Sequence, residues 1–132
     1  MATTIAEHYT GELVDWSRLI AFYDQEATEF ETKLAEVIQR NSIPNIAAKV
    51  EEQQDKLNVM MKKFNRIRIQ IRKQGAALKT DSAFIDDKLI HAETEKKQNG
   101  LRWDMQQTEK EYIDTRYACS EFLSERLKKK ND

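Results

Sequence analysis

Apolar residues recur at alternating spacings of three and four positions along two long stretches of this sequence. The first stretch has ten such positions over residues 6–37, and all ten are apolar. The second has eleven positions over residues 43–78, and all but Gln53 and Gln74 are apolar. A mean spacing of 3.5 residues draws one stripe along a helix, and that stripe must be buried against another helix. The pattern therefore predicts two long helices that pack together.

Capping and turn residues indicate where the helices begin and end. Thr4 and Glu7 have the spacing of a capping box, which places the start of the first helix near residue 5. Pro44 is tolerated only in the first turn of a helix, so it marks the start of the second. Residues 79–82 have the composition of a turn before a third helical segment. We expect a single domain over residues 1–132, an all-α, antiparallel coiled-coil-like bundle of three long helices at about 5–40, 43–78 and 82–128.

The third segment carries two apolar stripes that would lie on opposite sides of a helix. Ile85, Leu89 and Ala92 share one face. The residues that share the other face are Leu101, Met105, Tyr112, Cys119 and Leu123. Asn99 and Gly100 lie where the stripes meet, and such a pair is typical of a helix end. One long helix, straight or kinked, is the expected form, and a true break at Asn99–Gly100 that creates a fourth helix is the alternative.

The composition of the chain excludes several classes of protein. One proline and three glycines in 132 residues suit long helices and argue against a turn-rich β fold. The net charge of −1 gives no overall attraction to nucleic acid or anionic lipid. No apolar run approaches the ~20 residues of a membrane span. Because the first residues lack the pattern of a signal peptide and Cys119 is the one cysteine, we expect a cytoplasmic protein without intrachain disulfides.

Charge is divided unevenly between the first two helices. Residues 56–79 include eight basic residues and no acidic one, whereas the first half of the first helix is rich in Asp and Glu. In an antiparallel hairpin, residue i would face about residue 83 − i, so these stretches would neutralise each other, and Gln53 and Gln74 would fix the register. The alternative is a face that binds anions such as phosphate groups. Its side chains would be Lys62, Arg66, Arg68 and Lys73.

Few residues are candidates for catalysis or metal binding. Neither His8 nor His91 has a carboxylate three positions before it, as di-metal helical bundles require. Asp87, His91 and Glu95 would share one helix face, which we interpret as surface charge. Cys119 lies on an apolar stripe, and no base stands at a catalytic spacing from it. We therefore expect no catalytic, cofactor-binding or metal-binding residue, no enzyme activity and no small-molecule substrate.

Three apolar side chains of the third segment do not belong to its main stripe: Trp103, Ile113 and Tyr117. If they are exposed, they form a partner face, because Trp and Tyr dominate protein interfaces. A fourth helix or a broader core would bury them instead. We expect a non-enzymatic scaffold or adaptor that associates with itself, most simply as a homodimer, or with another protein. Binding of a polyanion or nucleic acid through the basic half of the second helix is the alternative.

The segment from Trp16 to Val37 combines a tryptophan, the pair Phe22–Tyr23 and acidic residues such as Asp24 and Glu26. In this it resembles a group of small, uncharacterised bacterial helical proteins, in which a second long helix follows. The resemblance covers roughly the first third to half of the chain. It implies an all-helical fold and brings no activity, cofactor or functional residue.

Overall fold

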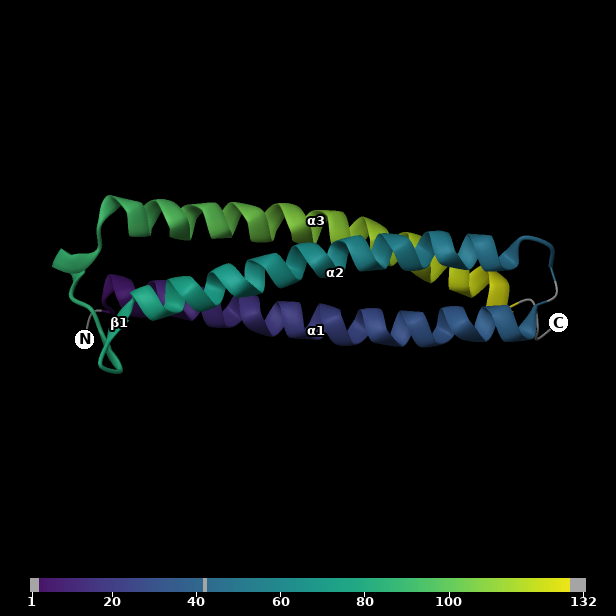
Figure 1. Cartoon of the computed structure of the whole chain (residues 1–132), viewed down its shortest axis with the longest axis horizontal. Coiled ribbons are helices and arrows are strands. Elements are labelled where there is room, and N and C mark those ends of the chain that lie inside the picture. The colour runs from purple at the N-terminus through teal and green to yellow at the C-terminus, as the bar shows by residue number, and fades with distance from the viewer. Residues whose placement is uncertain (1–2, 42, 129–132) are drawn as a thin grey trace. The chain divides into compact units, whose positions relative to one another are not determined.

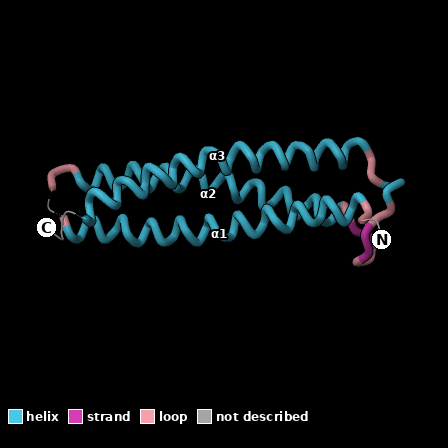
Figure 2. The backbone as a smooth tube through the Cα atoms, turned by 180° about the vertical axis from the view of Figure 1, so that it is seen from behind, coloured by secondary structure: helices cyan, strands magenta, loops and turns pink. Residues whose placement is uncertain are grey.

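The computed structural model describes residues 3–41 and 43–128 of the chain (Figure 1). Three long helices pack against one another, namely α1 (Ile5–Arg40), α2 (Ile46–Ala77) and α3 (Ala92–Lys128). Between α2 and α3 lie the strands β1 (Lys79–Thr80) and β2 (Ala83–Phe84) and the 3-10 turn η1 (Asp87–Leu89). Figure 2 shows how small the strand content is beside the helices. The predicted all-α bundle of three long helices is confirmed.

The chain forms two compact units, and each long helix contributes to both of them. Unit 1 consists of residues 3–21 and 64–107, so it holds the start of α1, the end of α2, the hairpin, η1 and the start of α3. Unit 2 consists of residues 22–41, 43–63 and 108–128, which are the remaining parts of the three helices. Each unit therefore has three helical segments and a core of its own.

Helix α2 runs antiparallel to α1, as the sequence predicts, and α3 runs in the direction of α1 (Figure 1). Within unit 1, Tyr9 and Glu12 of α1 are bonded to Gln98 and Arg102 of α3, so positions increase together along both helices. The carboxylate of Glu12 thus contacts α3 rather than α2.

The register between α1 and α2 differs from the predicted one. The rule of 83 − i would place Leu13 opposite Gln70. Instead, a Cβ atom added to Gly75 would lie 3.8 Å from Cδ1 of Leu13, which is a shift of about five residues. The cause is the connector, because α2 begins at Ile46 rather than at residue 43. Pro44 and Asn45 lie before the helix, and Asn45 has a φ of 69°.

The predicted capping box at the start of α1 is present in part. The Glu7 amide donates to Oγ1 of Thr4 at 3.2 Å, and the Thr4 hydroxyl donates to the Glu7 carboxylate at 3.1 Å. The Ile5 amide, which has no partner inside the helix, donates to Oδ1 of Asp87 at 2.9 Å. The carboxylate of η1 therefore ties the start of α1 to the connector that precedes α3.

The third helix begins ten residues later than predicted. Residues 79–84 form a two-residue hairpin in which Lys79 pairs with Phe84 and Thr80 with Ala83. Asp81 and Ser82 have φ values of 52° and 69°, as a type I′ hairpin turn requires. The residues expected to start the helix are therefore in the hairpin and η1, and α3 starts at Ala92.

This late start explains the change of apolar stripe. Ile85 and Leu89 belong to the connector, and Leu89 is exposed. Helix α3 runs without a break through Asn99 and Gly100, and the later predicted stripe is buried. Because only one stripe belongs to α3, neither a kink nor a fourth helix is needed to explain the pattern.

Both units have apolar cores built from the predicted stripes. The buried apolar residues of unit 1 are Ala6, Leu13, Ile20, Phe64, Ile67, Ile71, Leu78, Leu101 and Met105. Those of unit 2 are Tyr23, Ala27, Leu34, Val37, Ile46, Val50, Leu57, Met60, Tyr112, Cys119 and Leu123. Trp16 and Phe30 of the α1 stripe are half-buried rather than fully enclosed.

Candidate functional site

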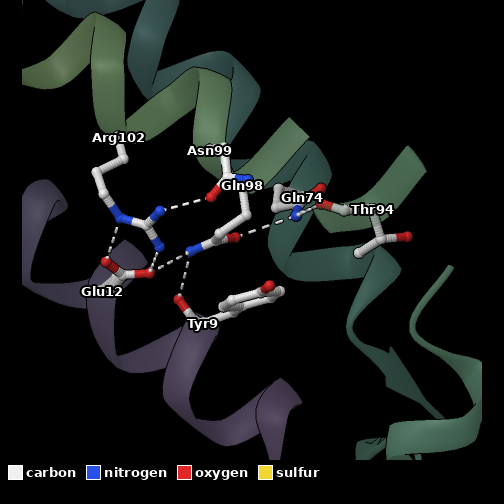
Figure 3. Close-up of polar contacts among 7 residues, drawn as sticks. All are labelled: Tyr9, Glu12, Gln74, Thr94, Gln98, Asn99 and Arg102. Carbon is white, nitrogen blue, oxygen red and sulfur yellow. Dashed lines mark hydrogen bonds and ion pairs between the residues drawn. The ribbon is translucent and has the colours of Figure 1, made fainter. Parts of the chain in front are cut away.

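A layer of polar side chains crosses the core of unit 1 (Figure 3). Gln98 and Gln74 are 0% and 3% exposed. Nε2 of Gln74 donates to Oε1 of Gln98 and to the backbone oxygen of Thr94, both at 3.0 Å. Nε2 of Gln98 donates to the Tyr9 backbone oxygen and to Oε1 of Glu12, both at 3.1 Å. All three helices are therefore joined through two buried amides.

At the edge of this layer, Glu12 and Arg102 form a two-point ion pair. Nε of Arg102 donates to one Glu12 oxygen at 2.8 Å, and Nη2 donates to the other at 2.6 Å. Nη1 donates to Oδ1 of Asn99 at 2.6 Å. The hydrogen bonds from Arg102, and next the one from Gln98, lower the pKa of Glu12 despite partial burial. An ionised, fully bonded carboxylate is suited to holding helices together and unsuited to proton transfer.

Unit 2 has a second layer of similar design. The Tyr112 hydroxyl and Nε of Arg116 donate to Oε1 of Glu26 at 2.7 and 2.8 Å. The Tyr23 hydroxyl donates to Oε2 of Glu109 at 2.5 Å. The guanidinium of Arg116 lies over the rings of both tyrosines, 5.5 and 5.6 Å from their centroids. Burial, and next the bond to Glu109, raises the pKa of Tyr23 to about 12, so this hydroxyl stays protonated.

The two layers use the same positions fourteen residues apart, which is two heptads. The pairs with equivalent side-chain bonds are Glu12 and Glu26, and Arg102 and Arg116; Gln98 and Tyr112 also correspond, and each donates to the equivalent glutamate. Tyr9 corresponds in sequence to Tyr23 but contributes its backbone oxygen rather than its hydroxyl. Sequence analysis identified the heptads but not this longer repeat, although comparing the chain with itself at a lag of fourteen would have found it. On α2 the repeat fails, because buried Met60 stands where Gln74 would recur. Accordingly, the Tyr112 hydroxyl turns to Glu26 on α1.

The predicted partner residues are all exposed, Trp103 in unit 1 and Ile113 and Tyr117 in unit 2. Their exposed fractions are 62%, 47% and 64%. The Tyr117 hydroxyl donates to Oε1 of Glu121, one helical turn away, at 3.4 Å. Burial of these side chains in a broader core or under a fourth helix, the alternative left open by the sequence, does not occur among the described residues.

The basic residues of α2 are not neutralised in the expected way. No ion pair joins α1 to α2 within the part of the chain that the structure describes, because the α1 carboxylates Glu12 and Glu26 bind arginines of α3. Lys63 pairs with Glu111 of α3 at 2.5 Å. Lys62, Arg66 and Lys73 are exposed and Arg68 is half-exposed, and within residues 3–41 and 43–128 none of the four forms an ion pair.

The remaining candidates offer little chemistry. Cys119 is fully buried, and burial raises the pKa of its thiol to about 11. Asp87, His91 and Glu95 do not share a helix face, because α3 begins only at Ala92. Among the described residues, no three His, Cys, Asp or Glu side chains are grouped so that they could hold a metal ion. None of the described helices is both long and apolar enough to cross a bilayer.

Comparison of the chain with protein-family models, with curated proteins and with solved structures finds no match. The resemblance of Trp16–Val37 to small bacterial helical proteins therefore stays an expectation.

Proposed function

We propose that this protein is a non-enzymatic helical scaffold or adaptor that associates with a protein surface through exposed side chains of α3. A second copy of the chain is the simplest partner. The observation that carries the proposal is the exposure of Trp103 and Tyr117, at 62% and 64%. Large aromatic side chains gain the most from burial in an interface and lose little side-chain entropy on binding.

The polar layers support this proposal, because they fix how α3 presents its outer side. Trp103 directly follows Arg102, which is bonded to Glu12, and Tyr117 directly follows Arg116, which is bonded to Glu26. A helix whose rotation is fixed on one side exposes the neighbouring side chains in one defined direction. A preorganised surface loses less entropy when it binds a partner.

Sedimentation velocity over a concentration series tests the proposal. The variants Trp103→Glu and Tyr117→Glu should each weaken association, because a carboxylate would be desolvated in the interface. Leu89→Glu and Val59→Glu are matched controls, since both residues are exposed by about as much (51% and 52%) but lie outside α3. Controls that weaken association as much as the α3 variants would contradict the proposal, and so would a wild-type protein that is monomeric throughout.

A second candidate function is the binding of a polyanion by the basic side chains of α2. It is favoured by the absence of ion pairs at Lys62, Arg66, Arg68 and Lys73 within the described residues. Titration with nucleic acid at two salt concentrations tests it, because each neutralised phosphate steepens the salt dependence. Arg66→Gln together with Lys73→Gln should reduce the slope of log binding constant against log salt concentration by about two, one for each lost phosphate contact. Lack of binding at low salt would eliminate this function.

A further inference from the structure

Unit 1 has an open groove of about 590 Å³ between α1 and α2. Its walls include Leu13, Val14 and Ile71, and Val14 is 42% exposed. Its lining also includes Gly75 and Ala76, and the absence or small size of their side chains lets another helix approach closely. The groove is therefore apolar, shallow and suited to side chains that project from a helix.

The charged groups that line this groove have one sign. They are Arg18 on α1 and Lys79 in β1, two residues beyond the end of α2. Neither forms an ion pair within the described part of the chain, although Lys79 lies 5.1 Å from the ring centroid of Phe84. A partner that covers the groove without supplying carboxylates would bury two uncompensated charges, which is costly. The matching surface must therefore be apolar and acidic.

Unit 2 presents a surface of this kind on α3. Ile113 and Tyr117 are its exposed apolar side chains, and Asp114 and Glu121 lie beside them, also exposed. We call these four residues the acidic face. Lys110 lies a turn before Asp114, and the charge of Arg116 is compensated by Glu26, so the surroundings keep a net negative charge.

The spacing of the charges agrees on the two surfaces. Lys79, just beyond the end of α2, lines the groove together with Thr10 of α1. Arg18 lies eight residues after Thr10 on the same helix, or ~12 Å at 1.5 Å per residue. Asp114 and Glu121 are seven residues apart on α3, or ~10 Å. The long, flexible side chains of Arg and Lys can bridge this difference.

We propose that the acidic face of one copy of the chain lies in the unit 1 groove of a second copy. This inference rests on the proposed association through α3 and names the surface that receives it. Ile113 and Tyr117 enter the apolar groove, while Asp114 and Glu121 approach the two cations. Every copy carries both the groove and the acidic face, so the contact can form between identical chains.

A charge swap tests the electrostatic part of the inference. One variant carries Arg18→Glu and Lys79→Glu, and the other carries Asp114→Lys and Glu121→Lys. Each alone should self-associate about tenfold more weakly than wild type, because like charges meet at both contacts. An equimolar mixture should regain association, because both contacts then pair opposite charges. A mixture that stays as weak as its components would overturn the inference.

A substitution in the groove lining tests the steric part. Gly75→Leu should block the groove, since Gly75 lines it and an added Cβ would make only an ordinary contact, 3.8 Å from Cδ1 of Leu13. Gly100→Leu is the matched control, because an added Cβ there meets nothing within 4 Å. Circular dichroism of both should show intact helices, as leucine is the better helix former.

The two proposals fail in different ways. If Tyr117→Glu abolishes self-association while Gly75→Leu has no effect, α3 mediates association but the groove does not receive it. If Gly75→Leu abolishes self-association while Trp103→Glu and Tyr117→Glu have no effect, the proposed function through α3 is wrong. If the wild type is monomeric at every concentration, the contact between copies is refuted.

Discussion

The buried amide pair of unit 1 leads to a sharp prediction about stability. Replacing Gln98 with leucine, which has a similar volume, removes the acceptor of one Gln74 hydrogen bond in a fully buried position. Gln74 keeps its bond to the Thr94 oxygen, so one buried N–H loses its partner. Leaving one buried donor unsatisfied costs about 1–3 kcal/mol. We expect Gln98→Leu to lower the free energy of unfolding by about 2 kcal/mol. Gln74→Leu should lower it by a similar amount, because the side-chain oxygen of Gln98 then loses its hydrogen-bond donor.

The double variant Gln74→Leu/Gln98→Leu should behave differently. Replacing both partners with apolar groups of the same shape is nearly neutral or stabilising, because neither amide is then left without its partner. Glu12 loses the Gln98 donor but keeps both bonds from Arg102. We therefore expect the double variant to be more stable than either single one, with a coupling of about 2 kcal/mol or more. Urea unfolding followed by circular dichroism measures all four proteins.

Met60→Leu is the control for volume changes, because Met60 is the buried residue two heptads before Gln74. This change between apolar residues of similar size should cost less than about 1.5 kcal/mol. If the two single costs simply add in the double variant, the amides do not act as a pair and the reasoning fails. A destabilised Met60→Leu would show that helix packing, rather than hydrogen bonding, dominates the measurement.

Three further predictions concern acid stability, the hairpin and the thiol. Hydrogen bonds from Arg102 lower the pKa of Glu12 in the folded state. The stabilising contribution of Glu12 is therefore present above its pKa in the unfolded chain and is lost as the pH falls through its pKa in the folded protein. Glu12→Gln should accordingly reduce the loss of unfolding free energy that acidification causes. Asp81→Asn with Ser82→Gly should raise stability by about 0.5–1 kcal/mol in urea unfolding, since both positions have positive φ, and a loss would contradict the type I′ assignment. Cys119 should resist a thiol reagent in the native protein near neutral pH and react after unfolding, because it is buried and burial raises its pKa to about 11; rapid native labelling would refute its enclosure.

The sequence predicted the helices where long-range apolar periodicity determined them. The stripes of α1 and α2 repeat over many heptads, so a local exception such as Gln74 does not disturb the pattern. The predicted start of α3 was wrong because the apolar pattern there is short. Ile85, Leu89 and Ala92 match a helical spacing over only two turns, and the positive φ of Asp81 and Ser82 has no strong signal in a sequence without glycine there.

The partners of the charged residues were harder to predict than the helices. Charge counts suggested that α1 and α2 neutralise each other, yet Glu12 and Glu26 bind arginines on α3. In a three-helix core, the rotation of a helix about its axis decides which neighbouring helix a flanking carboxylate contacts. The prediction considered only the hairpin of α1 and α2 and left α3 out. The exposure of Trp103 and Tyr117 was predicted as one of two alternatives. That prediction was possible because the angle between these residues and the Leu101–Leu123 stripe follows from their spacing along α3 and does not depend on the other helices.

The fourteen-residue repeat connects the interior of each unit to its exposed aromatic residue. Arg102 and Arg116 hold α3 to α1 by bonds to equivalent glutamates, and the residue after each arginine is a large, exposed aromatic. An arginine on the flank of the core places the following residue about 100° further around the helix, toward solvent. The same polar contacts that fix the register of the helices therefore also fix the direction of Trp103 and Tyr117. Exposure of these side chains is thus a consequence of how each core is built, and the proposed association through α3 rests on that exposure.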